Sequence, residues 1–119
     1  MRIAVLASED AIRPRLDGIG PASLVLCGDT HMPRVVQLGG VLIVNPGSIG
    51  MPAYTDDGAV PHIIETGAPH ARYAVVTRGP GGMWSAGLRA IPYDWHRAAR
   101  QAATNGRPMV ARWTTTGRA

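Results

Sequence analysis

Asp29 and His31 are the two residues of this sequence whose types and spacing best suit metal binding. They stand two positions apart in the segment 27–33, which reads C-G-D-T-H-M-P, and Gly28 lets the chain bend just before them. In an extended turn, side chains two positions apart point to the same side, so both can face one ion. A carboxylate with an imidazole suits a divalent metal such as Mn, Fe, Zn or Ni.

The same pair also has a purely local interpretation. Asp and His in a turn with glycine commonly form hydrogen bonds to the neighbouring backbone, and a D-x-H spacing alone is a weak signal. A catalytic metal site usually has three or more protein ligands, and this segment supplies two. We therefore predict one ion or none at Asp29 and His31, and we assign no catalytic residue.

A second turn, Asn45-Pro46-Gly47-Ser48, offers candidate substrate contacts. The hydroxyl of Ser48 and the N–H groups around it could bind a phosphate, so Asn45, Gly47 and Ser48 are the predicted substrate-binding residues. The competing interpretation is structural, because Asn, Pro, Gly and Ser are ordinary turn formers. For Gly47 the expected role is to give the backbone its conformation.

The other polar residues have simpler interpretations. His62 and His70 each follow a proline without acidic or Cys partners at ligand spacing, so we expect them to face solvent or form hydrogen bonds. His96 is expected to be exposed on a helix. The pair Asp56-Asp57 before a glycine is typical of a turn. Tyr54 is a possible cleft residue that no pattern in the sequence tests.

Short apolar runs separated by Gly, Pro and Asn predict a chain of mainly β strands with a short helix near each end. The predicted strands are 2–6, 23–27, 34–38, 41–44, 62–65, 71–77 and 84–90. The predicted helices are 9–16, with Ser8 as N-cap, and a helix from Trp95 after the N-cap Asp94, closed by Gly106 and Pro108.

Turn residues predict how these strands connect. Gly39-Gly40 and the glycine-rich stretch 79–82 should each close an antiparallel hairpin. The apolar run 23–27 favours a strand buried on both faces, with Cys27 as a buried thiol. Residues 49–61 show no period and are predicted to be a loop, and residues 109–119 are too short and mixed to assign.

Composition limits the possible functions. The chain has 119 residues and a net charge of +4, which comes from arginines spread along the sequence, so we do not expect nucleic-acid binding. No apolar run approaches the roughly 20 residues that span a bilayer, and the start has no signal-peptide pattern, so we expect a cytoplasmic protein without a membrane segment.

Taken together, four segments resemble the C-terminal half of calcineurin-like metallophosphoesterases of the small bacterial phosphodiesterase type. They read C-G-D-T-H-M-P-R, L-I-V-N-P-G-S-I-G-M-P-A-Y, H-I-I-E-T-G-A-P-H-A-R-Y-A-V and R-A-I-P-Y-D-W-H-R-A-A-R, and the resemblance runs from about Asp10 onward. It implies an α/β (α+β-like) fold class, a partial two-sheet sandwich, and divalent-metal hydrolysis of phosphomonoesters or phosphodiesters. In that family G-H-x-H supplies two metal ligands; His31 matches the second, and Asp29 replaces the first.

The resemblance also implies what is missing. The family pattern includes an N-terminal D-x-H, a G-D segment, a G-N-H and a further histidine, and none of these occurs here. We therefore expect a single truncated domain over 1–119 with an incomplete site, which is weak or inactive alone and either binds metal weakly or needs a complementing chain. The alternative is a non-catalytic remnant that acts as a binding or oligomerisation module, because half a sandwich leaves apolar sheet surface for a homo-oligomer.

Overall fold

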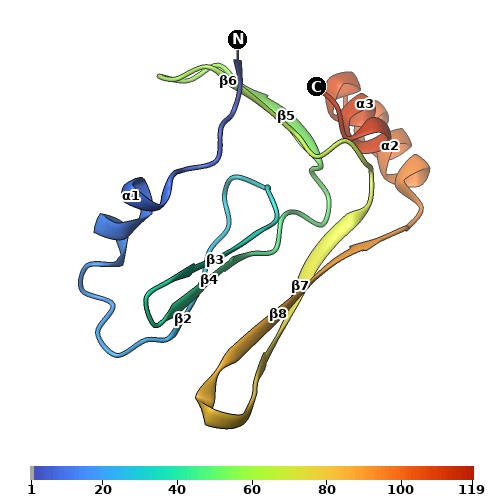
Figure 1. Ribbon diagram of the computed structural model, residues 1–119. Coiled ribbons are helices and arrows are strands. Elements are labelled where there is room, and N and C mark those ends of the chain that lie inside the picture. The colour runs from blue at the N-terminus through green and yellow to red at the C-terminus, as the bar shows by residue number, and fades with distance from the viewer. Residues whose placement is uncertain (1) are drawn as a thin grey trace.

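The computed structural model describes residues 2–119 and contains three small sheets with short helices near both ends of the chain (Figure 1). This mixed architecture, made mostly of strands, confirms the predicted α/β fold class. The sheets have the strand orders β1–β6–β5, β2–β4–β3 and β7–β8. Their strands are β1 (Arg2–Ile3), β2 (Leu24–Leu26), β3 (Arg34–Leu38), β4 (Val41–Asn45), β5 (Ala53–Asp56), β6 (His62–Glu65), β7 (Ala71–Arg78) and β8 (Trp84–Ile91).

The sheet β2–β4–β3 carries both candidate turns. Gly39-Gly40 joins β3 to β4 as an antiparallel hairpin, as predicted, and β2 pairs in parallel with β4. Because parallel strands end at the same edge of a sheet, the turn after β2 and the turn after β4 lie together. Val44 in the central strand is 0% exposed, so the core of the molecule reaches directly to this edge.

The sheet β1–β6–β5 faces the turn after β2. β6 pairs in parallel with β1 and antiparallel with β5, in a register that places Tyr54 opposite Ile64 and Asp56 opposite His62. The prediction of a loop over 49–61 was wrong for β5. This strand is only four residues long, too short to show a period, and it is fixed by pairing with β6 rather than by its own sequence.

Two helices cover the far end of β5 (Figure 1). α2 (Trp95–Thr104) begins as predicted at Asp94, whose carboxylate accepts a hydrogen bond from the Arg97 N–H at 2.9 Å. The tail that the sequence left unassigned forms α3 (Pro108–Thr116), which packs against α2 and β5. In residues 2–119 no helix is long and apolar enough to cross a membrane.

The N-terminal helix is weaker than predicted. α1 (Glu9–Ile12) forms one turn with Ser8 as N-cap, and a 3-10 turn, η1 (Arg13–Leu16), continues it. Pro14 explains the change, because its ring cannot continue the α-helical hydrogen-bond pattern. No residue of α1 or η1 is buried, and β1 covers only part of the predicted strand 2–6.

The prediction of a doubly buried strand over 23–27 was wrong. β2 is an edge strand with β4 on one side only, and its Leu26 is 63% exposed. Cys27, expected to be a buried thiol, is exposed. The apolar composition of this run therefore does not reflect burial within the described residues.

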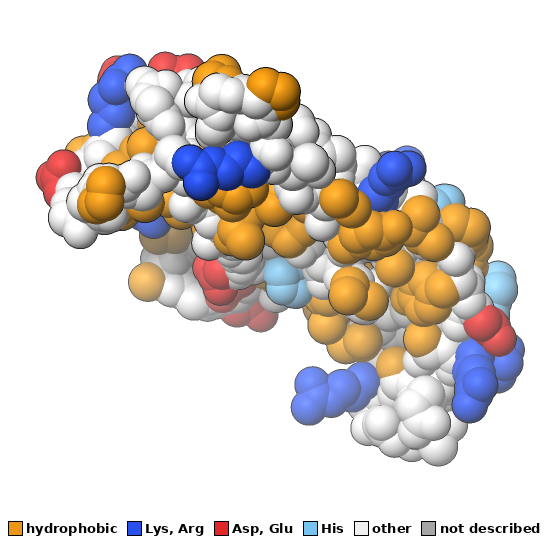
Figure 2. Space-filling view, turned by 90° about the horizontal axis from the view of Figure 1, so that it is seen from below, with side chains coloured by type: hydrophobic (Ala, Val, Ile, Leu, Met, Phe, Trp, Pro, Cys, Tyr) orange, Lys and Arg blue, Asp and Glu red, His pale blue; other side chains and the backbone are white. Residues whose placement is uncertain are grey.

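The molecule is more open than its length requires. Its radius of gyration is 16.4 Å, against about 13.5 Å expected for a compact chain of this size. Its accessible surface is 7717 Å², against about 6,200 Å² for a typical monomer of this mass. Figure 2 shows hydrophobic side chains gathered over much of one face. The hairpin β7–β8 alone exposes Tyr73, Val75, Met83, Leu88 and Ile91.

Candidate functional site

The turn after β2 has an unusual backbone. Asp29 and His31 have φ angles of 74° and 60°, and they are the only non-glycine residues among 2–119 with positive φ. This left-handed conformation costs about 1–2 kcal/mol for a residue with a Cβ. Such strain persists where the surrounding structure imposes it, and it is concentrated at functional sites. The strain falls on the two residues that the sequence selected as metal ligands.

One ring nitrogen of His31 is fixed and the other is free. Nδ1 lies 3.0 Å from the carbonyl oxygen of Met51. A carbonyl can only accept, so Nδ1 must carry the proton, and Nε2 keeps a lone pair. Within residues 2–119 that Nε2 makes no hydrogen bond. A histidine held through one nitrogen by a backbone carbonyl is the usual arrangement of a metal ligand.

Tyr54 contacts His31 and is influenced by the charge of Asp29. The ring of His31 meets that of Tyr54 edge to face, with centroids 5.1 Å apart. The pKa of Tyr54 is raised, mainly by burial and to a smaller extent by the negative charges of Asp29 and Asp56. The charge of Asp29 therefore acts on the phenol that the His31 ring contacts, and Asp29 also lines the N-terminal cleft.

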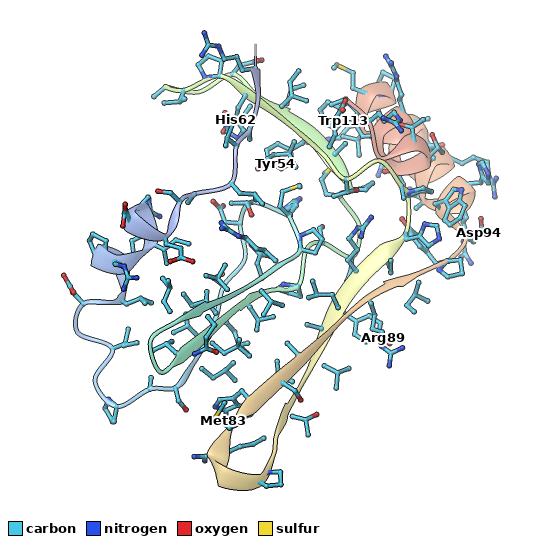
Figure 3. All side chains as sticks on the ribbon, viewed as in Figure 1. Tyr54, His62, Met83, Arg89, Asp94 and Trp113 are labelled. Carbon is cyan, nitrogen blue, oxygen red and sulfur yellow. The ribbon has the colours of Figure 1, made fainter. Side chains whose placement is uncertain are left out.

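Beyond Tyr54 the same face continues to His62, whose ring centroid is 6.0 Å from that of Tyr54 (Figure 3). The Nδ1 of His62 lies 2.8 Å from the carbonyl of Val60, which confirms the expected hydrogen-bonded histidine. Tyr54 is the residue of this region that sequence reasoning could not assign. No local spacing marks it, and only the packing of β5 against the turn shows its position.

Asn45 joins the two turns. Its Nδ2 donates to the carbonyl of Gly28 at 3.3 Å and to Oγ1 of Thr30 at 3.0 Å, while its Oδ1 accepts from the N–H of Gly47 at 3.0 Å. The residue is 7% exposed. Its amide is thus engaged within the protein and positions the turn that carries Asp29 and His31. A direct contact of Asn45 with substrate stays a prediction.

Gly47 and Ser48 have structural roles beside the site. Gly47 has φ 87°, and a Cβ there would lie 3.1 Å from Cβ of Arg72 and 3.3 Å from Cδ of Pro33, so the position requires glycine. Ser48 accepts a hydrogen bond on Oγ from the Met51 N–H at 3.0 Å, which steadies the carbonyl that holds His31. Phosphate binding at Gly47 and Ser48 stays a prediction.

Two clefts open beside the turn. The N-terminal cleft, about 540 Å³, lies between the segment from Ala4 to Leu16 and the sheet face of Val25, Val36 and Ile43. Its polar lining includes Asp29, Thr30 and Asn45 together with the arginines Arg15 and Arg34. The hairpin cleft, about 510 Å³, lies between β7 and the edge formed by Leu26, Cys27 and Gly47. A ligand or a second chain could therefore reach the turn from two directions.

The remaining histidines and the acidic pair also have defined positions. His96 is exposed, as expected. The Asp56 carboxylate accepts from the Gly58 N–H at 2.7 Å, which confirms the turn at Asp56-Asp57. The expectation for His70 was wrong: its Nδ1 is buried and has no hydrogen-bond partner in the part of the chain that the structure describes, and its ring centroid lies 5.5 Å from that of Trp95.

The arrangement fits part of a metal site. Nε2 of His31 makes no hydrogen bond within residues 2–119, and Asp29, two residues before it, carries an exposed carboxylate. However, among residues 2–119 no group of three or more His, Cys, Asp or Glu side chains is placed to hold an ion. Two ligands are fewer than a catalytic ion needs, so no reaction step follows from this chain alone.

Comparison with known proteins identifies the family. Residues 3–67 match the model of the calcineurin-like phosphoesterase superfamily domain. The match covers just over half of the chain and includes both turns and Tyr54, whereas the hairpin β7–β8 and the helices α2 and α3 lie outside it. No curated protein and no solved structure gives a significant match. The chain belongs to the calcineurin-like phosphoesterase superfamily.

Proposed function

We propose that this chain contributes part of the active site of a metal-dependent phosphoester hydrolase. Asp29 and His31 supply two ligands to a divalent metal, and the substrate is a phosphomonoester or phosphodiester. Membership of the superfamily supports the reaction class. The observation that carries the assignment is His31, whose Nδ1 is held by the Met51 carbonyl while Nε2 makes no hydrogen bond within residues 2–119.

The protein's own contribution is to position these groups. Asn45 ties the turn to β4, and the Met51 carbonyl fixes the tautomer of His31. Burial raises the pKa of Tyr54 above its ordinary value, so its hydroxyl stays protonated well above neutral pH and can donate a hydrogen bond. A bound divalent metal would neutralise phosphoryl oxygens and activate water. The described residues supply two ligands, so we propose that the remaining ligands come from outside them.

Metal binding and hydrolysis test the proposal together. Mn²⁺ retained after equilibrium dialysis and hydrolysis of bis(4-nitrophenyl) phosphate are measured on the wild type, on His31→Asn and on His96→Asn. Asn tolerates the left-handed backbone of position 31, so the first variant removes the imidazole without adding strain. His96→Asn is the matched control, because His96 is exposed and distant in sequence from the turn.

We expect the wild type and His96→Asn to bind Mn²⁺ and to show slow hydrolysis that depends on Mn²⁺. His31→Asn should lose at least 10-fold in both measurements. A wild type that binds no Mn²⁺, or binding and hydrolysis that persist in His31→Asn, would contradict the proposal.

The openness of the molecule favours a second candidate, a non-catalytic binding or oligomerisation module. The chain exposes roughly 1,500 Å² more surface than a typical monomer of its mass. Under this function the purified protein sediments as a dimer or larger species and hydrolyses no phosphodiester with added Mn²⁺. A stable monomer at tens of micromolar would count against it.

The cytoplasm is the proposed location for either function. The one cysteine, Cys27, is free and exposed. An exposed thiol persists in a reducing compartment, whereas it is oxidised or paired in an oxidising one. Alkylation of Cys27 in intact cells, followed by mass spectrometry, would test this, and a disulfide-linked or glutathionylated Cys27 would oppose it.

A further inference from the structure

The hairpin cleft contains one cationic side chain and, among the described residues that line it, no acidic one. Arg72 is the cation, and the other lining residues are apolar side chains, glycines, Tyr73 and Cys27. Within residues 2–119 the one ion pair joins Arg13 to Glu9, so no described carboxylate neutralises Arg72. The volume of about 510 Å³ falls within the roughly 300–1,000 Å³ of small-molecule sites. The charge and size of the cleft therefore suit a small anion.

Strand β7 and the turn after β4 position the Arg72 side chain. Half-buried and exposed residues alternate along β7 from Arg72 to Val76, so Arg72 lies on the face of the strand that is turned toward the molecule. Its backbone N–H donates to the carbonyl of Ser48 at 3.1 Å. A Cβ added at Gly47 would lie 3.1 Å from Cβ and 3.2 Å from Cδ of Arg72. The stem of Arg72 is thus packed against this turn, at one end of the cleft.

The guanidinium of Arg72 has an unsatisfied donor. Its Nε is buried and has no hydrogen-bond partner in the described part of the chain. Burying a charged donor without an acceptor costs free energy, so such groups are normally paired. A guanidinium binds a phosphate or carboxylate through two parallel N–H···O bonds, and Nε can supply one of them. An oxyanion in the cleft would satisfy this donor.

The remaining lining suits an apolar group attached to that anion. Leu26 and Ile49 line the cleft although they are 63% and 69% exposed, and the buried Val44 lies between the same walls. An apolar substituent in the cleft would remove part of this surface from water, which favours binding. Inorganic phosphate would leave these side chains exposed. An organic anion therefore fits the lining better than a free ion does.

We propose that the hairpin cleft binds an organic phosphate, whose phosphoryl oxygens accept hydrogen bonds from Arg72 and whose apolar substituent covers Leu26 and Ile49. A phosphate head is preferred to a carboxylate because the chain belongs to a phosphoesterase superfamily. The site requires neither a metal ion nor His31, so it is independent of the proposed function.

Calorimetric titration in EDTA tests the site, with phenyl phosphate as the probe. We expect phenyl phosphate to bind at least 10-fold more tightly than inorganic phosphate and more tightly than benzoate. Arg72→Gln should weaken it at least 10-fold, because glutamine keeps part of the stem and loses the charge and the Nε donor. Arg15→Gln is the matched control, since Arg15 is exposed and lines the N-terminal cleft instead.

A second pair of variants keeps the test decisive if thermal melts show that Arg72→Gln is unfolded. Ile49→Asp places a carboxylate in the cleft and should weaken phenyl phosphate at least 10-fold, with little effect on folding because Ile49 is 69% exposed. Met83→Asp should leave binding unchanged, since Met83 is 72% exposed and is not among the lining residues.

The single cysteine gives an independent readout. Cys27 is exposed and lines the cleft, so saturating phenyl phosphate should slow its alkylation by iodoacetamide. The protection should persist in Arg15→Gln and disappear in Ile49→Asp. Because Cys27 also lines the N-terminal cleft, protection that persists in Ile49→Asp would place the ligand there and contradict the proposed site.

The remaining outcomes are equally clear. Phenyl phosphate that does not bind, or that binds equally to the wild type and Ile49→Asp, overturns the site. Inorganic phosphate that binds as tightly as phenyl phosphate, or benzoate that binds more tightly, also overturns it. A wild type that binds phenyl phosphate in EDTA and retains no Mn²⁺ contradicts the proposed function alone.

Discussion

The turn that carries Asp29 and His31 is held firmly on one side and is open on the other. On the β4 side, Val44 is 0% exposed and Asn45 makes three hydrogen bonds that tie the turn in place. On the other side lies the N-terminal segment, where no residue of α1 or η1 is buried and Val5 is 92% exposed. The N-terminal cleft separates the two regions.

This difference separates the geometry of the candidate ligands from their number. The geometry of the two candidate ligands depends on β4 and β5, both of which the chain contains. The number of ligands depends on what covers the open side, which the described residues do not supply. Stability should therefore be concentrated on the β4 side, and function should depend on a partner on the other.

The largest difference in unfolding free energy should be between alanine substitutions at a valine of β4 and at a valine of the N-terminal segment. Val44→Ala removes two methyl groups from a fully buried position and should lower the free energy of unfolding by about 2–3 kcal/mol. Val5→Ala should change it by less than about 0.5 kcal/mol, because Val5 is exposed. Urea denaturation measures both. Equal losses would show that the N-terminal segment is packed as tightly as β4.

The next effect concerns the link between the two turns. Asn45→Ala removes three hydrogen bonds and leaves the Gly47 N–H without a partner among residues 2–119, so we expect a loss of about 1–2 kcal/mol in unfolding free energy. Mn²⁺ affinity should also fall, because the turn loses its support. Asn105→Ala is the control: this exposed residue has one side-chain hydrogen bond, from Gln101, and its loss should cost less than about 0.5 kcal/mol. An Asn45→Ala protein as stable as this control would show that the link does not hold the turn.

A substitution at Asp29 should have a smaller effect on the unfolding free energy, and it should stabilise the protein. Asp29 is exposed, its side chain makes no hydrogen bond within residues 2–119, and its φ is 74°. Asp29→Gly should therefore raise the free energy of unfolding by up to about 1 kcal/mol while lowering Mn²⁺ affinity. The matched change Asp57→Gly, at a residue without positive φ, should be neutral or destabilising. A destabilised Asp29→Gly would mean that the carboxylate supports the fold rather than a ligand.

The smallest expected change in unfolding free energy concerns Tyr93, just before α2. The hydroxyl of Tyr93 is buried without a hydrogen-bond partner among residues 2–119, and burial raises its pKa. Tyr93→Phe removes that unsatisfied group and should change the unfolding free energy by about 0 to 1 kcal/mol in the stabilising direction.

The raised pKa also gives a pH dependence for Tyr93. Below pH 10 the phenol is protonated in both states; above it the unfolded chain ionises first, so folded stability falls as pH rises. Tyr93→Phe should lose less stability than the wild type between pH 9.5 and 11 in thermal melts. An identical decline in both proteins would exclude Tyr93 as a contributor.

Patterns that are local in sequence were predicted correctly. Gly39-Gly40 closes its hairpin, Asp94 and Ser8 cap their helices, and the strands from His62 onward were recognised from their composition. In each case the determining interactions lie within a few residues, where turn and cap preferences operate.

Features that depend on distant partners could not be predicted. The apolar run ending at Cys27 suggested burial, but its exposure depends on whether another strand covers the edge of β2. β5 is defined by β6, and Tyr54 reaches the site only because β5 packs against the turn. The left-handed backbone of Asp29 and His31 is likewise imposed by the surrounding structure, since neither residue type signals it strongly.

The state of the His31 imidazole tests the central claim most directly. A long-range ¹H–¹⁵N spectrum of the side-chain nitrogens reports which nitrogen carries the proton, and Zn²⁺ reports which nitrogen binds. We expect a proton on Nδ1, an unprotonated Nε2, and a shift of that Nε2 on adding Zn²⁺ while His96 is unchanged. A proton on Nε2 of His31, or a spectrum that Zn²⁺ leaves unaltered at His31, would contradict its role as a metal ligand.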